Sequence, residues 1–181
     1  MIQGCRCGTR GARLDGRRER MSVTSLDKDL DNLAFTLTAD FPSPIERVWR
    51  LWSDPRQLER WWGPPAYPAT VEAYDLTPGG GVTYFMTGPD GDTRRGWWRV
   101  TSVVAPASLE FTDGFADADG VPSAGKPTTA TRVTLTERDG GTRMEMRSVF
   151  DTREQMDQLA EMGMEEGLRE AVGQMDALLA G

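Results

Sequence analysis

Residues 41–65 read FPSPIERVWRLWSDPRQLERWWGPP, and the prolines and tryptophans of this stretch predict two short helices. Pro42 ends the strand before it, Ser43 is a typical N-cap residue, and Pro44 suits a first helical turn. The large apolar residues that follow share one helical face: Ile45, Val48, Trp49 and Trp52, with Leu51 at its edge. A first short helix is therefore expected directly after Pro44.

The second short helix is predicted by the pair Asp54-Pro55. Asp is a good N-cap residue, and Pro is tolerated in a first turn because its missing N–H has no partner there. Leu58, Trp61 and Trp62 then lie on the inner side of this helix, which Gly63 ends. The aromatic inner faces of both helices predict a lid or floor that packs against a larger element.

That larger element is a sheet. Residues 33–41 alternate between apolar and polar side chains, which is typical of a half-buried strand. Six further strands separated by Gly- and Pro-rich turns are expected at residues 69–76, 82–86, 96–104, 108–113, 131–137 and 142–150. The pattern predicts a seven-stranded antiparallel sheet.

A long amphipathic helix is expected to follow the sheet. Its apolar residues recur at spacings of three and four: Met164, Leu168, Ala171, Val172, Met175, Leu178 and Leu179. Seven strands, two short helices after the first strand and one long C-terminal helix give an α+β fold, with the sheet wrapped around the helix. One helix cannot cover a curved sheet completely, so a gap between them is expected.

Two glycines lie on or beside the apolar stripe of this helix. Each glycine costs a helix about 1 kcal/mol relative to alanine, so Gly163 and Gly167 need a structural reason. They indicate either close backbone packing or empty space beside the helix, and the pattern favours packing.

Composition and charge limit the function. The chain has 181 residues, of which 38% are apolar and 27% charged, as in an ordinary single domain. Residues 1–20 carry a net charge of +4 from six Arg and two acids, so residues 21–181, with 15 basic and 26 acidic residues, carry −11. An acidic body disfavours nucleic acid as a partner. No run has the roughly 20 apolar residues of a membrane span, and no signal peptide is recognisable, so a cytoplasmic location is expected.

The N-terminal region is expected to form no part of the domain. Residues 1–30 are predicted to be a disordered basic tail, with Met21 as the natural start of the protein, and residues 31–181 the folded domain. The chain has no histidine, and its only cysteines are Cys5 and Cys7 in the tail. This composition excludes Ser-His and Cys-His nucleophile pairs and favours neither a metal nor a cofactor.

Five stretches in order carry a resemblance to a known family: FPSPIERVWRLWSDPRQLERWWGP, YDLTPGGGVTYFMTGPDG, GWWRVTSVVAPASLEF, ERDGGTRMEM and GMEEGLREAVGQMDALLAG. Residues 33–179 resemble the START-like, or SRPBCC, superfamily with its helix-grip fold. The nearest branch is similar to bacterial homologues of the C-terminal domain of the heat-shock-protein-90 ATPase activator. The resemblance implies an internal hydrophobic cavity, but its members include carriers, aromatase/cyclases, regulators and cochaperone-like proteins, so no single activity follows.

The leading hypothesis is a protein that binds a small hydrophobic or aromatic molecule between the sheet and the C-terminal helix. The residues expected to line this site are Trp52, Trp61, Tyr84, Met86, Trp98, Phe111, Met164 and Leu168. The same aromatic residues could instead be plain core, and methionines are both adaptable pocket walls and ordinary core fillers. The ligand and the choice between monomer and homodimer are left open.

Two other functions remain open. By resemblance, the chain could act on a protein partner as a cochaperone that stimulates a chaperone ATPase. A cyclase-like enzyme would instead need an acid or base inside the cavity, and without histidine Tyr84 is the best candidate. Since no residue pattern forces such a group inward, the sequence favours a binding protein over an enzyme.

Overall fold

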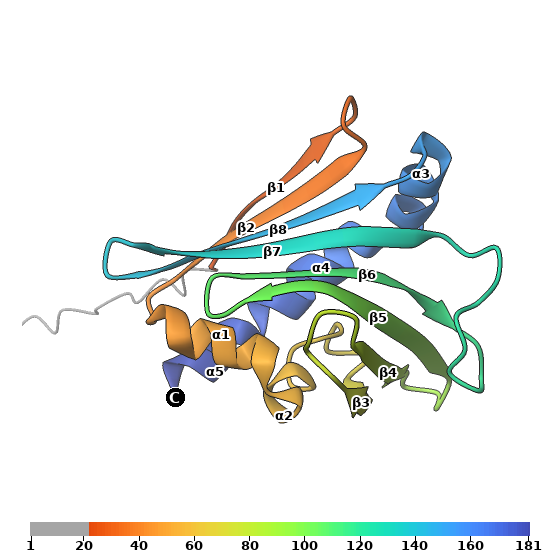
Figure 1. Cartoon of the computed structure of the whole chain (residues 1–181), viewed down its shortest axis with the longest axis horizontal. Helices are drawn as coiled ribbons and strands as arrows, with labels where there is room; N and C mark the ends of the chain where they lie inside the picture. Colours follow the sequence, from red (N-terminus) through yellow and green to blue (C-terminus); the bar gives the residue numbers. More distant parts are fainter. Residues whose placement is uncertain (1–21) are drawn as a thin grey trace, which may run out of the picture.

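The computed structural model describes residues 22–181 as one curved antiparallel sheet with helices on its concave side (Figure 1). The strands are β1 Val23–Asp29, β2 Ala34–Phe41, β3 Ala69–Tyr74, β4 Gly81–Thr87, β5 Thr93–Val104, β6 Ser108–Ala116, β7 Thr128–Arg138 and β8 Gly141–Phe150. Their order in the sheet is β1-β2-β8-β7-β6-β5-β4-β3. The α+β class and the antiparallel sheet are therefore confirmed.

The sheet has eight strands rather than the predicted seven. The additional strand is β1, Val23–Asp29, which the prediction had assigned to the tail. Its sequence, VTSLDKD, has few apolar residues and no clean alternation, because it lies at the edge of the sheet and is largely exposed. Pairing with β2 holds it there, so the strand depends on a neighbour more than on its own pattern. Residues 1–21, with Cys5, Cys7 and the rest of the predicted tail, lie outside the described residues.

The two short helices begin where they were predicted, but the second ends at Leu58 rather than at Gly63, so Trp61 and Trp62 lie in the turn that follows it. The helices are α1 Ile45–Ser53 and α2 Pro55–Leu58, and the side chain of Asp54 accepts a hydrogen bond from the backbone N–H of Arg56. The cap of the first helix also differs from the prediction. Ser43 does not cap α1: the N-cap position is Pro44, without a side-chain hydrogen bond. The carbonyl of Ser43 instead accepts a 2.7 Å hydrogen bond from the hydroxyl of Thr142, which fixes the entry to α1 against β8.

The C-terminal helix is interrupted. It consists of α3 Arg153–Glu161, α4 Met164–Gly173 and α5 Met175–Ala180, of which α3 has no counterpart in the prediction. Gly163 lies between α3 and α4 with a φ of +83°, a backbone conformation that glycine adopts without strain. The predicted apolar stripe spans α4 and α5, whose buried residues include Val172 and Met175.

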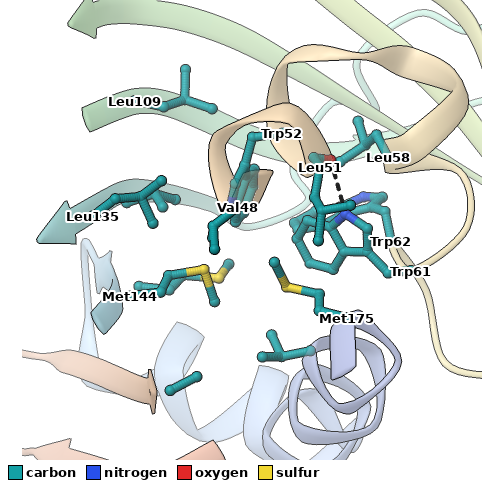
Figure 2. Packing of buried hydrophobic residues seen from close by; sticks show 14 of the residues in the cluster. Val48, Leu51, Trp52, Leu58, Trp61, Trp62, Leu109, Leu135, Met144 and Met175 are labelled. Atoms are coloured by element: carbon teal, nitrogen blue, oxygen red, sulfur yellow. Dashed lines mark hydrogen bonds between the residues drawn. The ribbon is translucent and has the colours of Figure 1, made fainter. Parts of the chain in front are cut away.

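The main core lies where α1, α2 and α5 meet the sheet (Figure 2). Trp52 and Trp61 are almost completely buried and pack edge to face, with ring centroids 4.6 Å apart. The indole N–H of Trp61 donates a 2.9 Å hydrogen bond to the carbonyl of Leu51, drawn as a dashed line in Figure 2. This hydrogen bond holds the turn that follows α2 against α1.

Candidate functional site

A cavity of about 280 Å³ lies between the concave face of the sheet and the helices α3 and α4. This volume is close to the lower end of the range of small-molecule pockets, about 300–1,000 Å³. Strands β4 to β8, the α3–α4 junction and the loop after α2 all contribute to its wall. Most of its lining side chains are apolar, and they include Trp62, Met86, Phe115, Met146, Leu159, Met164 and Leu168. The predicted gap between sheet and helix therefore exists.

The eight residues predicted to line a ligand site fall into two groups. Tyr84, Met86, Met164 and Leu168 border the cavity. The other four lie in the packed core and do not border it: Trp52, Trp61, Trp98 and Phe111. The sequence pattern identified inward-facing residues, but it could not separate those beside open space from those behind a packed layer.

Trp62, which was not among the eight predicted lining residues, lies between the cavity and the predicted residues that are packed in the core. Its ring packs edge to face against Trp98 at 4.8 Å and against Tyr84 at 6.1 Å. Behind it, Trp98 stacks on Phe111 with ring centroids 4.3 Å apart. Trp62 therefore forms an aromatic part of the cavity wall, and Trp98 and Phe111 are packed behind it.

The glycines of the C-terminal helix leave empty space, so the interpretation of close packing is wrong. Gly163 and Gly167 both border the cavity, and a Cβ built at either position would meet no atom within 4 Å. A larger side chain at Gly167 would project from the middle of α4 beside the cavity. The cavity is thus partly made by the absence of side chains on α4.

Asp113 is the principal site residue that the sequence analysis missed. Along β6, Leu109 and Phe111 are buried inward, and the same alternation brings Asp113 to the cavity wall. The residue is half-buried because it borders the cavity, but its Oδ1 atom is shielded from solvent and makes no hydrogen bond to another described residue. Removal from water disfavours the charged form and raises the pKa of the Asp113 carboxyl to about 7. The period-two pattern of β6 was the signal that could have found it.

Tyr84 lies beside this carboxyl. Its hydroxyl rests over Gly96 of the neighbouring strand, where a Cβ would come within 2.4 Å of the hydroxyl oxygen and force a shift. Burial raises the pKa of Tyr84, and the negative charge of Asp113 raises it further. The indoles of Trp62 and Trp98, which pack against the Tyr84 ring, oppose this rise in the pKa of Tyr84, although neither indole N–H has a hydrogen-bond partner among the described residues.

Small hydroxyls on β7 and β8 are further polar groups of the wall. The side chains of Thr131 and Ser148, on β7 and β8, share a 3.1 Å hydrogen bond and so satisfy each other. Thr129 pairs across the sheet with Asp113. Among residues 22–181, no group of three His, Cys, Asp or Glu side chains is arranged to hold a metal ion. Nor does this part of the chain contain a helix long and apolar enough to cross a membrane.

The cavity opens to solvent between the α3–α4 junction and the first residues of β5. Met162 is 57% exposed on one side of the opening, and Arg94 is exposed on the other. The guanidinium of Arg94 lies over the ring of Tyr67 at 4.4 Å and donates a 3.2 Å hydrogen bond to the Tyr67 hydroxyl. A cation–π contact of this kind gives the rim a charged group without burying it.

The sequence of this chain matches a known protein family. A family model described as Activator of Hsp90 ATPase homolog 1-like protein matches residues 42–180. The comparison with curated proteins gives no significant match.

Three solved structures show the range of similarity. The crystal structure of protein Ms6760 from Mycobacterium smegmatis is 49% identical, with a TM-score of 0.81, and the match covers 87% of this chain and 96% of that one. A solution structure from Arthrobacter aurescens is 52% identical, with a TM-score of 0.84 and coverage of 87% and 92%. DynU16, a protein in the dynemicin biosynthetic locus, is 20% identical, with a TM-score of 0.59 and coverage of 82% and 47%. At that identity DynU16 shows only that the fold is shared.

Proposed function

The chain belongs to the family of Activator of Hsp90 ATPase homolog 1-like proteins, and for this member we propose a function in binding a small, largely apolar molecule inside the cavity. The family match confirms the resemblance drawn from the sequence motifs. It does not name a ligand, so the argument for binding rests on the cavity itself.

The observation that carries the proposal is open space lined mainly by apolar side chains. Interiors are normally packed as densely as organic crystals, and cavities larger than a water molecule are few. Here about 280 Å³ stays open, and glycine occupies two positions that border it, Gly163 at the N-cap of α4 and Gly167 within α4. Trp62 supplies a flat surface, and Met86, Met146 and Met164 supply thioether side chains that adapt to different shapes. The result is a site suited to an apolar or aromatic molecule.

Ligand-induced stabilisation tests the proposal. The melting temperature of the protein is measured with a panel of fatty acids and aromatic compounds, and native mass spectrometry detects any molecule that copurifies. A compound that binds at 100 times its Kd should stabilise the folded state by about 2.7 kcal/mol. The proposal fails if no compound in the panel changes the melting temperature and the purified protein carries no small molecule.

A matched pair of variants locates the binding. Gly167→Leu adds a side chain beside the cavity and should abolish the stabilisation. Gly173→Leu adds the same side chain to the same helix at a position that does not border the cavity, where a Cβ also meets no atom within 4 Å, and should leave binding intact. Equal stabilisation of both variants would place the ligand elsewhere.

A second candidate function is acid–base catalysis, and the observation that favours it is Asp113. A carboxyl in the cavity wall with its pKa raised to about 7 can exchange a proton near neutral pH. A cyclase-like enzyme would use it on a carbonyl compound held against Trp62. The test is to incubate the protein with linear poly-β-ketones and to follow cyclised products by mass spectrometry. Asp113→Asn should abolish any acceleration, and the absence of acceleration by the native chain would remove this candidate.

A further inference from the structure

The cavity contains a polar corner to which the side chains of Asp113 and Tyr84 contribute. Oδ1 of Asp113 is shielded from solvent and accepts no hydrogen bond from another described residue. Tyr84 borders the same cavity, and its hydroxyl rests over Gly96. The two residues are neighbours across β5, because Tyr84 pairs with Gly96 and Asp113 pairs with Trp98, two residues further along the same face of that strand. Buried polar groups normally find partners, so this corner is complete only when a third group lies in it.

Tyr84 and Asp113 differ in the hydrogen bonds that they can make to a bound molecule. The phenol hydroxyl of Tyr84 can donate one hydrogen bond, whereas the ionised carboxylate of Asp113 can only accept them. The corner therefore offers one donor and one acceptor to the cavity.

We infer that the molecule bound in this cavity carries a hydroxyl group, which accepts a hydrogen bond from Tyr84 and donates one to Asp113. A ketone or ether would satisfy Tyr84 but leave the carboxylate without a donor. An ammonium would satisfy the carboxylate but leave the Tyr84 hydroxyl without an acceptor. A hydroxyl is the smallest group that does both, and the apolar remainder of the molecule would lie against Trp62 and the methionines. The inference rests on the proposed function and adds the specificity of the same site.

Three probes of nearly equal shape separate this inference from the proposed function. They are 2-naphthol, which donates and accepts, 2-methoxynaphthalene, which only accepts, and 2-methylnaphthalene, which does neither. Their Kd values are measured at pH 8 by titration with ¹³C-methyl-labelled methionine as the NMR reporter, because Met86, Met146 and Met164 border the cavity. We expect 2-naphthol to bind at least tenfold more tightly than either analogue, a difference of about 1.4 kcal/mol.

Two variants assign the preference to its residues. Tyr84→Phe removes a single oxygen atom and should reduce the preference for 2-naphthol without abolishing binding of 2-methylnaphthalene. Asp113→Leu removes the acceptor and should have the same effect, whereas Asp113→Asn keeps a carbonyl acceptor and should retain part of the preference. If Asp113→Leu does not fold, Tyr84→Phe and Asp113→Asn still carry the test.

The outcomes are distinct. Equal affinity of the native protein for all three probes would overturn the inference but leave the proposed function standing. Failure of all three to bind up to their solubility limits would overturn both. A tenfold preference that persists unchanged in Tyr84→Phe and in the Asp113 variants would show that the hydroxyl is recognised elsewhere and would also overturn the inference.

Discussion

Replacing Asp113 by Asn should change how the stability of the protein depends on pH. In the folded protein, burial raises the pKa of the Asp113 carboxyl from its ordinary value of 3.8 to about 7. Between these two values the folded state holds a proton that the unfolded chain has released. Stability therefore falls as pH rises through this window and levels off above pH 7, because both states are then deprotonated. An Asn side chain does not titrate, so the variant lacks this contribution.

The magnitude follows from the same values. Each pKa unit corresponds to about 1.4 kcal/mol, so the whole window from pH 3.8 to 7 is worth about 4 kcal/mol. Between pH 5 and pH 8 linkage predicts that the native protein loses about 2–3 kcal/mol more stability than Asp113→Asn. All other titrating groups are common to the two proteins, so the comparison between them isolates this carboxyl.

Urea unfolding followed by tryptophan fluorescence at pH 5, 6, 7 and 8 measures the effect, since several tryptophans are buried. Asp90→Asn is the matched control, because it makes the same chemical change at an exposed position and should track the native protein. A constant stability difference between the native protein and Asp113→Asn across this pH range would refute the reasoning. It would show that the carboxyl remains hydrated in the folded state.

Four further substitutions test the packing and polar contacts of the fold. Gly167→Ala should stabilise the protein by about 1 kcal/mol, because alanine favours the helix and its Cβ meets no atom. Gly63→Ala should destabilise the protein by about 1–3 kcal/mol, because Gly63 has a φ of +123° and the new Cβ would lie 2.5 Å from a backbone carbonyl oxygen. Thermal melts in which Gly63→Ala is the more stable variant would contradict both predictions. Trp61→Phe should cost about 1–3 kcal/mol in urea unfolding by leaving the buried carbonyl of Leu51 without its donor, and a cost near zero would show that water replaces the indole. Asp40→Asn weakens a bidentate ion pair with Arg143 of the adjacent strand and should lower the free energy of unfolding by no more than about 1 kcal/mol. If this loss does not shrink in 1 M salt, the stabilisation by the pair is not electrostatic in origin.

Local patterns account for what the sequence predicted well. Pro44 and Pro55 marked the starts of α1 and α2, and Asp54 was identified as a helix cap, because these effects act within a few residues. The end of α2 at Leu58, before the predicted Gly63, was not identified. Alternation located seven of the eight strands, since each has one buried face. The alternation of apolar residues did not predict strand β1, because an edge strand needs no apolar face and is held by pairing with its neighbour β2.

The candidate site depended on distances that no local pattern encodes. The sequence by itself determined which side chains face inward on each strand and helix, and hence that Trp98, Phe111, Met164 and Leu168 would all be internal. Only the tertiary structure decided that the first two are packed behind Trp62 while the last two border open space. The physical reason is that the direction of a side chain is set by the regular repeat of the helix or strand that carries it. Whether a cavity forms depends instead on the distance between the sheet and a helix far away in the sequence. The same separation left Asp113 without a hydrogen-bond partner and gave the cavity its polar corner.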